Sequence, residues 1–235
     1  MKGFDVLAIL IDPRFTGMLW LGVKMTAVVA VGSWLLAMGL AFVLLGMRLV
    51  PHAVPQRAVQ VYLSYHRNVP TLVQLMLWYF GIANLLPGSL QAWLANHNAE
   101  AVFAVIGLGL CQAAYFSEDL RSGLRAVPAG QAEAARALGH GFIGTLRHVL
   151  FPQAIRNALP ALVNHTVSLF KNSSLAMAIG VAELTHAVKE IENLSFRAFE
   201  SYLLATVMYL SASLLLMGAG AWLERRTRIV GQGAR

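Results

Sequence analysis

The sequence predicts an all-α integral membrane protein with five transmembrane helices. Hydrophobic residues make up 57% of the chain and charged residues only 12%, whereas a soluble protein of 235 residues carries far more charge on its surface. Several apolar runs reach the ~20 residues that cross ~30 Å of hydrocarbon. Only the segment from Gln131 to Pro152 is long, amphipathic and unlike a span. It therefore predicts one sizeable loop outside the bilayer.

The amino-terminal part predicts a short lead followed by a long span. We expect residues 1–17 to lie outside the membrane, because Asp5, Asp12 and Pro13 interrupt any signal-peptide core. The first span is predicted over about 18–47, where small residues would let membrane helices approach closely. Arg48 marks its end.

The next apolar region, residues 59–86, is interrupted at Pro70. Proline lacks a backbone donor and disfavours helix at the residue before it. We therefore expect a short helix before the break and a spanning helix over about 70–85. A loop over 88–100 and a third span over about 101–121 follow in the prediction.

The segment 128–152 predicts two short helices with a bend at Gly139–Gly141, because glycine suits sharp turns and is poor inside helices. The alternative is one amphipathic helix lying on the bilayer surface. The remaining chain predicts a fourth span, a charged helical segment, a fifth span and a basic tail, at about 159–181, 183–200, 201–222 and 223–235.

The basic residues set the predicted orientation. Positive charge is favoured in short cytoplasmic segments, and an outside amino terminus places twelve basic residues in the cytoplasm against five outside. The cytoplasmic set is Arg48, Arg57, Arg67, Arg121, Arg125, Arg136, Arg147, Arg156, Arg225, Arg226, Arg228 and Arg235. This orientation puts the 128–152 loop and the carboxyl terminus inside the cell. It also accounts for the formal charge of +7 without a nucleic-acid partner.

Motifs for catalysis or cofactor binding are missing from the sequence. None of the four lysines follows a glycine, so there is no phosphate-binding Gly-Lys-Ser/Thr loop. The sequence contains neither Gly-x-Ser-x-Gly nor a His-Glu-x-x-His metal motif. The single cysteine, Cys111, excludes an intrachain disulfide. We expect no catalytic residue, metal site or cofactor in this chain.

A polar set inside the fourth predicted span is the strongest candidate for a substrate path. Asn164, Ser168, Lys171 and Asn172 recur at i, i+4, i+7 and i+8, and Ser173 follows them. A lysine near mid-span costs several kcal/mol unless it faces a cavity or a partner. The alternatives are a lysine paired with Glu118 or snorkelling toward an interface, and polar residues that only join helices.

The loop resembles the EAA motif of ABC-importer permeases. The pattern is Glu133-Ala134-Ala135, three residues, Gly139, nine residues, and an apolar run ending in Pro152. In that family the loop is the coupling helix, which seats in a groove of the ATP-hydrolysing subunit. The resemblance implies that Glu133, Ala134, Ala135, Gly139 and Pro152 form the coupling surface.

Three further stretches, 66–74, 114–123 and 170–175, resemble polar amino acid permeases, and the last carries the Lys-Asn-Ser of glutamate/aspartate permeases. The resemblance implies a substrate path through residues from all three stretches and from the fourth predicted span. These residues are Arg67, Asn68, Gln74, Glu118, Asn164, Ser168, Lys171, Asn172 and Ser173.

The resemblance also implies a type I (MetI-like) importer fold in the bacterial inner membrane. Such importers pair two permeases with ATPases, which hold the ATP and Mg²⁺, and with an extracytoplasmic amino-acid-binding protein. Because Asn172 adds no negative charge and Lys171 attracts carboxylates, glutamate and aspartate are the expected substrates. Glutamine, histidine or a broad set of amino acids is the alternative, and an intramembrane enzyme or a passive channel is a more distant one.

Overall fold

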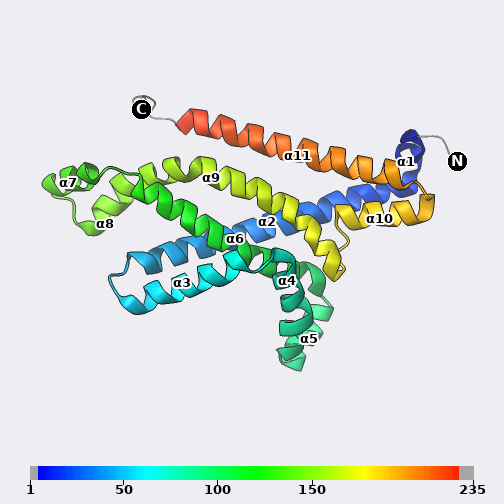
Figure 1. Ribbon diagram of the computed structural model, residues 1–235, viewed down its shortest axis with the longest axis horizontal. Coiled ribbons are helices and arrows are strands. Elements are labelled where there is room, and N and C mark those ends of the chain that lie inside the picture. The colour runs from blue at the N-terminus through cyan, green and yellow to red at the C-terminus, as the bar shows by residue number, and fades with distance from the viewer. Residues whose placement is uncertain (1–4, 228–235) are drawn as a thin grey trace.

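The computed structural model describes residues 5–227, and every regular element in that range is helical (Figure 1). The α-helices are α1 (Leu7–Ile11), α2 (Pro13–Leu49), α3 (Ala53–Asn68), α4 (Thr71–Met76), α5 (Gly88–Ala95), α6 (Ala99–Arg125), α7 (Ala129–Ala137), α8 (Phe142–Thr145), α9 (Phe151–Asn172), α10 (Leu184–Ser195) and α11 (Ala198–Thr227). Residues 1–4 of the predicted lead and 228–235 of the predicted basic tail lie outside the described residues.

Three helices of the described chain, α2, α6 and α11, are long and apolar enough to cross a membrane. The second predicted span is shorter than these three helices. It consists of α4, a π turn and a 3₁₀ turn, which together end at Leu85. The fourth corresponds to α9, which has 22 residues but a more polar sequence. The all-α membrane fold is confirmed, with three clear spans and two segments that are short or polar.

Helix α6 is the centre of the bundle, packed between α2 and α9. In its most apolar window 61% of the residues are buried, against 17% for α11, which lies at the periphery. The close approach of α6 to α9 depends on Gly123, since a Cβ there would lie 2.3 Å from the Ala154 carbonyl oxygen. Helices α7 and α8 project beyond one end of the long helices, and α1 and α10 lie at the other end (Figure 1).

The first span begins earlier than predicted. Helix α2 starts at Pro13, and the carboxylate of Asp12 accepts a hydrogen bond from the Arg14 backbone N–H at 2.9 Å. Proline fits the first helical turn and aspartate is a favoured cap. Two of the three residues that argue against a signal peptide, Asp12 and Pro13, therefore start the longest helix of the described chain.

The loop predicted over 88–100 is wrong, because this segment contains α5. Pro87 precedes the first turn, and its carbonyl oxygen accepts hydrogen bonds from the backbone N–H groups of Leu90 and Gln91. Leu94 is buried and anchors the helix. The Pro87-Gly88 pair thus starts a helix here and does not open an irregular loop.

The fourth predicted span is displaced. Helix α9 starts at Phe151 and contains Pro160 in its interior, and the chain continues as a 3₁₀ turn over Ser173–Ile179. Lys171 therefore lies at the carboxyl end of α9 and not near mid-span. The first turns of α9 were not predicted as part of the span, because Gln153 and Arg156 interrupt the apolar sequence there. The charged segment after it is helical as predicted, as α10.

Candidate substrate path and coupling surface

A small polar cavity lies between α4, α6 and α9. Its volume is about 170 Å³, and two of the predicted path residues, Ser168 and Asn172, line it. The other polar residues of its wall come from three helices: Thr71, Gln112, Tyr115 and His165. Hydroxyl, amide and imidazole groups can bind the amino and carboxylate groups of a small zwitterion.

The cavity wall on α9 differs from the predicted face. His165, Ser168 and Asn172 line it at i, i+3 and i+7, whereas Asn164 and Lys171 are exposed and lie outside it. The predicted spacing combined residues from two adjacent sides of one helix, since each step along a helix rotates by about 100°. Asn164 and Lys171 therefore lie outside this cavity.

His165 is held in place by the carboxylate of Asp119. The Nδ1 atom of His165 lies 2.6 Å from Oδ2 of Asp119, and the Gln112 side-chain amide donates to the His165 carbonyl oxygen at 3.1 Å. Asp119 is buried. The negative charge nearest the cavity is thus engaged by a neighbouring imidazole, which leaves no free carboxylate on the cavity wall.

A second pocket, of about 470 Å³, contains three more of the predicted path residues, Arg67, Asn68 and Glu118. Arg48 joins them and forms an ion pair with Glu118. Arg121 lies 3.9 Å from the same carboxylate. Arg48 and Arg67 against the single carboxylate of Glu118 give the wall of this pocket a net positive charge. Glu118 is therefore not the partner of Lys171, contrary to the alternative weighed from the sequence.

Aromatic rings connect the two pockets. The Arg67 guanidinium carbon lies 5.9 Å from the ring centre of Tyr115. The Tyr115 and His165 rings are 5.1 Å apart, and both residues line the polar cavity. Tyr115 therefore lies between His165 of the polar cavity and Arg67 of the second pocket.

Two predicted path residues are buried and hydrogen-bond to the backbone. Gln74 is fully buried, and its amide donates to the carbonyl oxygens of Val69 at 2.7 Å and His66 at 3.1 Å, where Pro70 breaks the helix. It satisfies backbone groups that the break would leave without partners. Ser173 is also buried and donates to the Phe170 carbonyl oxygen at 2.6 Å. The side chains of Gln74 and Ser173 both miss the cavity.

The bend predicted in the loop is present. Helix α7 ends at Ala137, Gly139 adopts a left-handed φ of +87°, and α8 begins at Phe142. The backbone N–H of His140 donates to the Ala135 carbonyl oxygen and that of Gly139 to the Arg136 carbonyl oxygen. These two bonds define a Schellman motif, which requires a left-handed residue after the helix.

The loop presents an exposed surface at the end of the molecule farthest from α10 (Figure 1). Glu133, Ala134, Gly139 and Pro152 are exposed, whereas Ala135 is buried. The apolar side chains at its tip are highly exposed to solvent, with exposed fractions of 82% for Leu138, 71% for Phe142 and 76% for Ile143. An apolar tip rimmed by polar residues is typical of a protein-binding surface.

The predicted set misses several polar residues that the structure brings to the two pockets, among them Arg48, Thr71, Gln112, Tyr115 and His165. One signal was available, because Gln112 and Tyr115 interrupt an apolar helix three residues apart and therefore share a face. Arg48 gave no such signal, since an arginine at the end of a span is ordinary. Its role depends on which helix packs beside it.

The chain is similar to several known transport proteins. The sequence profile of a family described as "Binding-protein-dependent transport system inner membrane component" matches residues 35–229. The glutamate/aspartate import permease protein GltJ of Escherichia coli K12 is 29% identical over 224 residues, covering 94% of this chain and 91% of that protein. The arginine transport system permease protein ArgU of Corynebacterium glutamicum is 35% identical over 200 residues, covering 82% of this chain and 63% of that protein.

One crystal structure, of an amino acid ABC transporter with histidines, matches with a TM-score of 0.83 at 28% identity. The match covers 96% of this chain and 100% of that one.

Proposed function

The chain belongs to the family of binding-protein-dependent transport system inner membrane components, and from that premise we propose that it imports acidic amino acids, glutamate and aspartate first. At the coarser level the chain is a membrane-embedded permease subunit of an amino-acid ABC importer, and it is a transport subunit and not an enzyme. The family implies an ATPase and a binding protein as partners.

The pocket around Arg67 carries the substrate proposal. Arg48 and Arg67 face a single carboxylate, Glu118, and Asp119 near the polar cavity is engaged by His165. A wall with excess positive charge stabilises a side-chain carboxylate and repels a cationic side chain. A substrate carboxylate entering this pocket can share Arg48 with Glu118 or bind Arg67, which is exposed.

We propose alternating access as the mechanism. ATP and Mg²⁺ bind the partner ATPases, whose closure moves the loop around Glu133, Ala134, Ala135, Gly139 and Pro152. A second permease, identical or homologous, completes the path, and the binding protein delivers substrate to the outer face. In this proposal the amino terminus lies outside and the carboxyl terminus in the cytoplasm of a bacterial inner membrane.

Import by the complete complex in proteoliposomes tests the substrate proposal. Arg67→Met should lower glutamate import about fivefold relative to glutamine import, the effect of a partly screened charge interaction of ~1 kcal/mol. Arg57→Met is the matched control, because Arg57 is an exposed arginine of the same helix outside both pockets. Equal losses for glutamate and glutamine in Arg67→Met would refute the assignment.

The second candidate is a basic or broad amino acid substrate. The similarity to an arginine permease and to a transporter structure with histidines favours it. The same liposomes discriminate the two, because a basic substrate should gain from Arg67→Met by losing a repulsive charge. Faster arginine import in that variant, with glutamate import unchanged, would replace the acidic assignment.

A further inference from the structure

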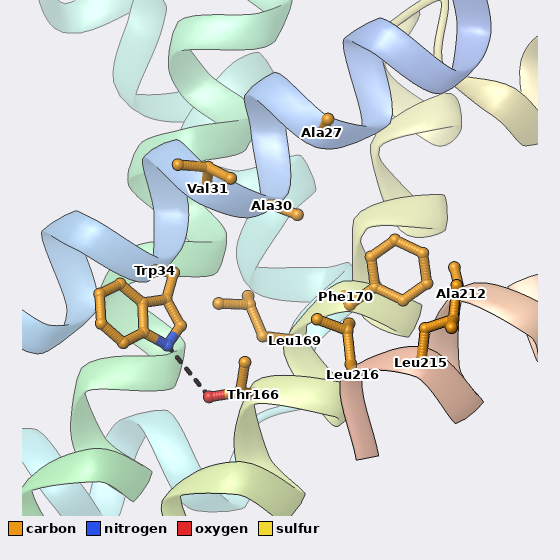
Figure 2. Close-up of a pocket in the computed structure, with 10 residues that line it drawn as sticks. All are labelled: Ala27, Ala30, Val31, Trp34, Thr166, Leu169, Phe170, Ala212, Leu215 and Leu216. Atoms are coloured by element: carbon orange, nitrogen blue, oxygen red, sulfur yellow. Dashed lines mark hydrogen bonds between the residues drawn. The ribbon is translucent and has the colours of Figure 1, made fainter. Parts of the chain in front are cut away.

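An apolar groove lies between α2, α9 and α11, separate from the polar cavity (Figure 2). Its volume is about 460 Å³, and its lining includes Ala27, Val31, Phe170 and Leu215. Helices α2 and α11 both pack against α9, but few direct contacts join them to each other. The groove is the space left between them.

The polar groups in the groove already have partners. The Trp34 indole N–H donates to the hydroxyl of Thr166 at 3.0 Å, as Figure 2 shows. The Thr166 hydroxyl in turn donates to the Leu162 carbonyl oxygen at 2.7 Å. Because these polar groups already form hydrogen bonds within the protein, they need none from a ligand, and the groove suits a purely hydrocarbon occupant.

A cation lies in line with the groove on α2. Trp20 shares the helix face of Ala27, Val31 and Trp34 at spacings of 7, 11 and 14 residues. The Lys24 ammonium lies 4.9 Å from the Trp20 ring centre. No carboxylate among residues 5–227 forms an ion pair with Lys24, so its charge remains available to an anion from outside the chain.

Lys24 is positioned at one boundary of the hydrocarbon layer. Residues 25–47 of α2 carry no charge, and Lys24 and Arg48 flank them. This stretch is about 35 Å long at ~1.5 Å per residue, slightly more than the ~30 Å hydrocarbon core. Lys24 turned toward Trp20 resembles the lysine and tryptophan pairs that anchor helices at the lipid headgroups.

We propose that this groove binds one anionic phospholipid, with an acyl chain between α2, α9 and α11 and the phosphate at Lys24. On α2 the groove runs from Ala27 to Trp34, and a second apolar pocket of about 340 Å³ that shares Trp34 continues it to Met38. The stretch from Ala27 to Met38 is about 17 Å long at ~1.5 Å per residue. This length is close to one leaflet, half of the ~30 Å core, whereas a packed transmembrane helix would need a groove along the whole core. Length, apolar lining and the free cation together select a lipid over a second protein helix.

Native mass spectrometry of the purified full chain tests the lipid site. The chain is mixed with equal amounts of phosphatidylglycerol and phosphatidylcholine that have identical acyl chains. The wild type should retain one phosphatidylglycerol with at least fivefold preference, the effect expected for one lysine near the headgroups. Lys24→Gln should remove that preference, and Lys189→Gln, which changes another exposed lysine on α10, should keep it.

Filling the groove gives a second, independent arm. Ala27→Phe and Ala212→Phe should each abolish retention of both lipids, because the rings occupy the acyl-chain space. Val43→Phe, an exposed position on α2 outside the groove, is the control. Unchanged retention in Lys24→Gln and both groove variants would overturn the proposal. Loss of chain dimers in the groove variants with lipid retention intact would assign the groove to a second copy instead.

Discussion

At the scale of single residues, Asn172 and Asn164 form a natural pair for testing the cavity. Both lie on α9, but Asn172 lines the polar cavity and Asn164 is exposed outside it. A new carboxylate ~4 Å from a substrate carboxylate costs on the order of 4 kcal/mol at an effective dielectric near 20. Cavity water lowers this to about 1–2 kcal/mol, or roughly tenfold in apparent affinity.

We therefore expect Asn172→Asp to raise the apparent Km for glutamate about tenfold in proteoliposomes of the complete complex. Asn164→Asp should leave it unchanged. The assay compares glutamate with glutamine within each variant, because equal loss for both substrates indicates a folding defect. The same Km shift in both variants would remove Asn172 from the path.

Gly139 allows a test that separates backbone shape from side-chain space. A Cβ at this position meets no atom within 4 Å, so only the φ of +87° opposes substitution. Gly139→Leu should cost about 1–2 kcal/mol in the Schellman motif, because L-residues resist left-handed backbone. Gly139→Asn should be better tolerated, since asparagine adopts that conformation more readily.

The readout is ATP-driven import against the basal ATPase rate of the assembled complex. Gly139→Leu should lower import per ATP hydrolysed, and Gly139→Asn should restore most of it. Import at the wild-type ratio in Gly139→Leu would contradict the coupling role of this loop.

At the scale of the elements, the contact of α6 with α9 depends on one missing side chain. A Cβ at Gly123 would lie 2.3 Å from the Ala154 carbonyl oxygen and 2.8 Å from the Ala158 Cβ. Backbone cannot move aside as a flexible side chain does, so Gly123→Ala should destabilise the fold by about 1–3 kcal/mol. Gly39→Ala, where nothing lies within 4 Å, is the control.

Thermal unfolding of the two variants in detergent measures this difference. Gly123→Ala should unfold at a lower temperature than both the wild type and Gly39→Ala. Identical unfolding temperatures for Gly123→Ala and Gly39→Ala would mean that α6 and α9 can move apart enough to accommodate the added methyl group.

The elements that local chemistry defines were predictable from the sequence. Pro70 lacks a backbone donor and disfavours helix at Val69, and a glycine pair in an amphipathic segment predicts a bend, so the α3–α4 break and the α7–α8 bend were predicted correctly. Helix α5 was missed because Pro87-Gly88 was interpreted as a loop signal. The start of α9 was missed because its first turns carry charge and Pro160 lies inside the helix.

The site was predictable only in part, because it depends on how helices rotate against one another. Ser168 and Asn172 were predicted on chemical grounds and lie in the cavity. Gln74 shows the limit of a motif resemblance, since the same residue that matches a family pattern serves the backbone at Pro70. Arg48 depends on the packing of α2 beside α6, which no local sequence pattern reports.

At the scale of the whole molecule, the proposed orientation is open to direct labelling. Ser89 and Asn193 are exposed near α5 and α10, and Ala137 is exposed on the loop. After Cys111→Ala, cysteines at Ser89 and Asn193 should react with an impermeant maleimide in intact cells. A cysteine at Ala137 should react only after permeabilisation. Labelling of a cysteine at position 137 in intact cells would contradict the proposed orientation.

The apolar tip of the coupling loop also affects how the subunit survives before assembly. Leu138, Phe142 and Ile143 are each more than two thirds exposed, and in the proposed orientation an unassembled chain presents them to the cytoplasm. Exposed apolar segments on orphan subunits attract chaperones and proteases. The cellular lifetime of this permease should therefore follow the supply of its ATPase, so that the loop we propose as the transmitter of motion would also tie subunit abundance to partner synthesis.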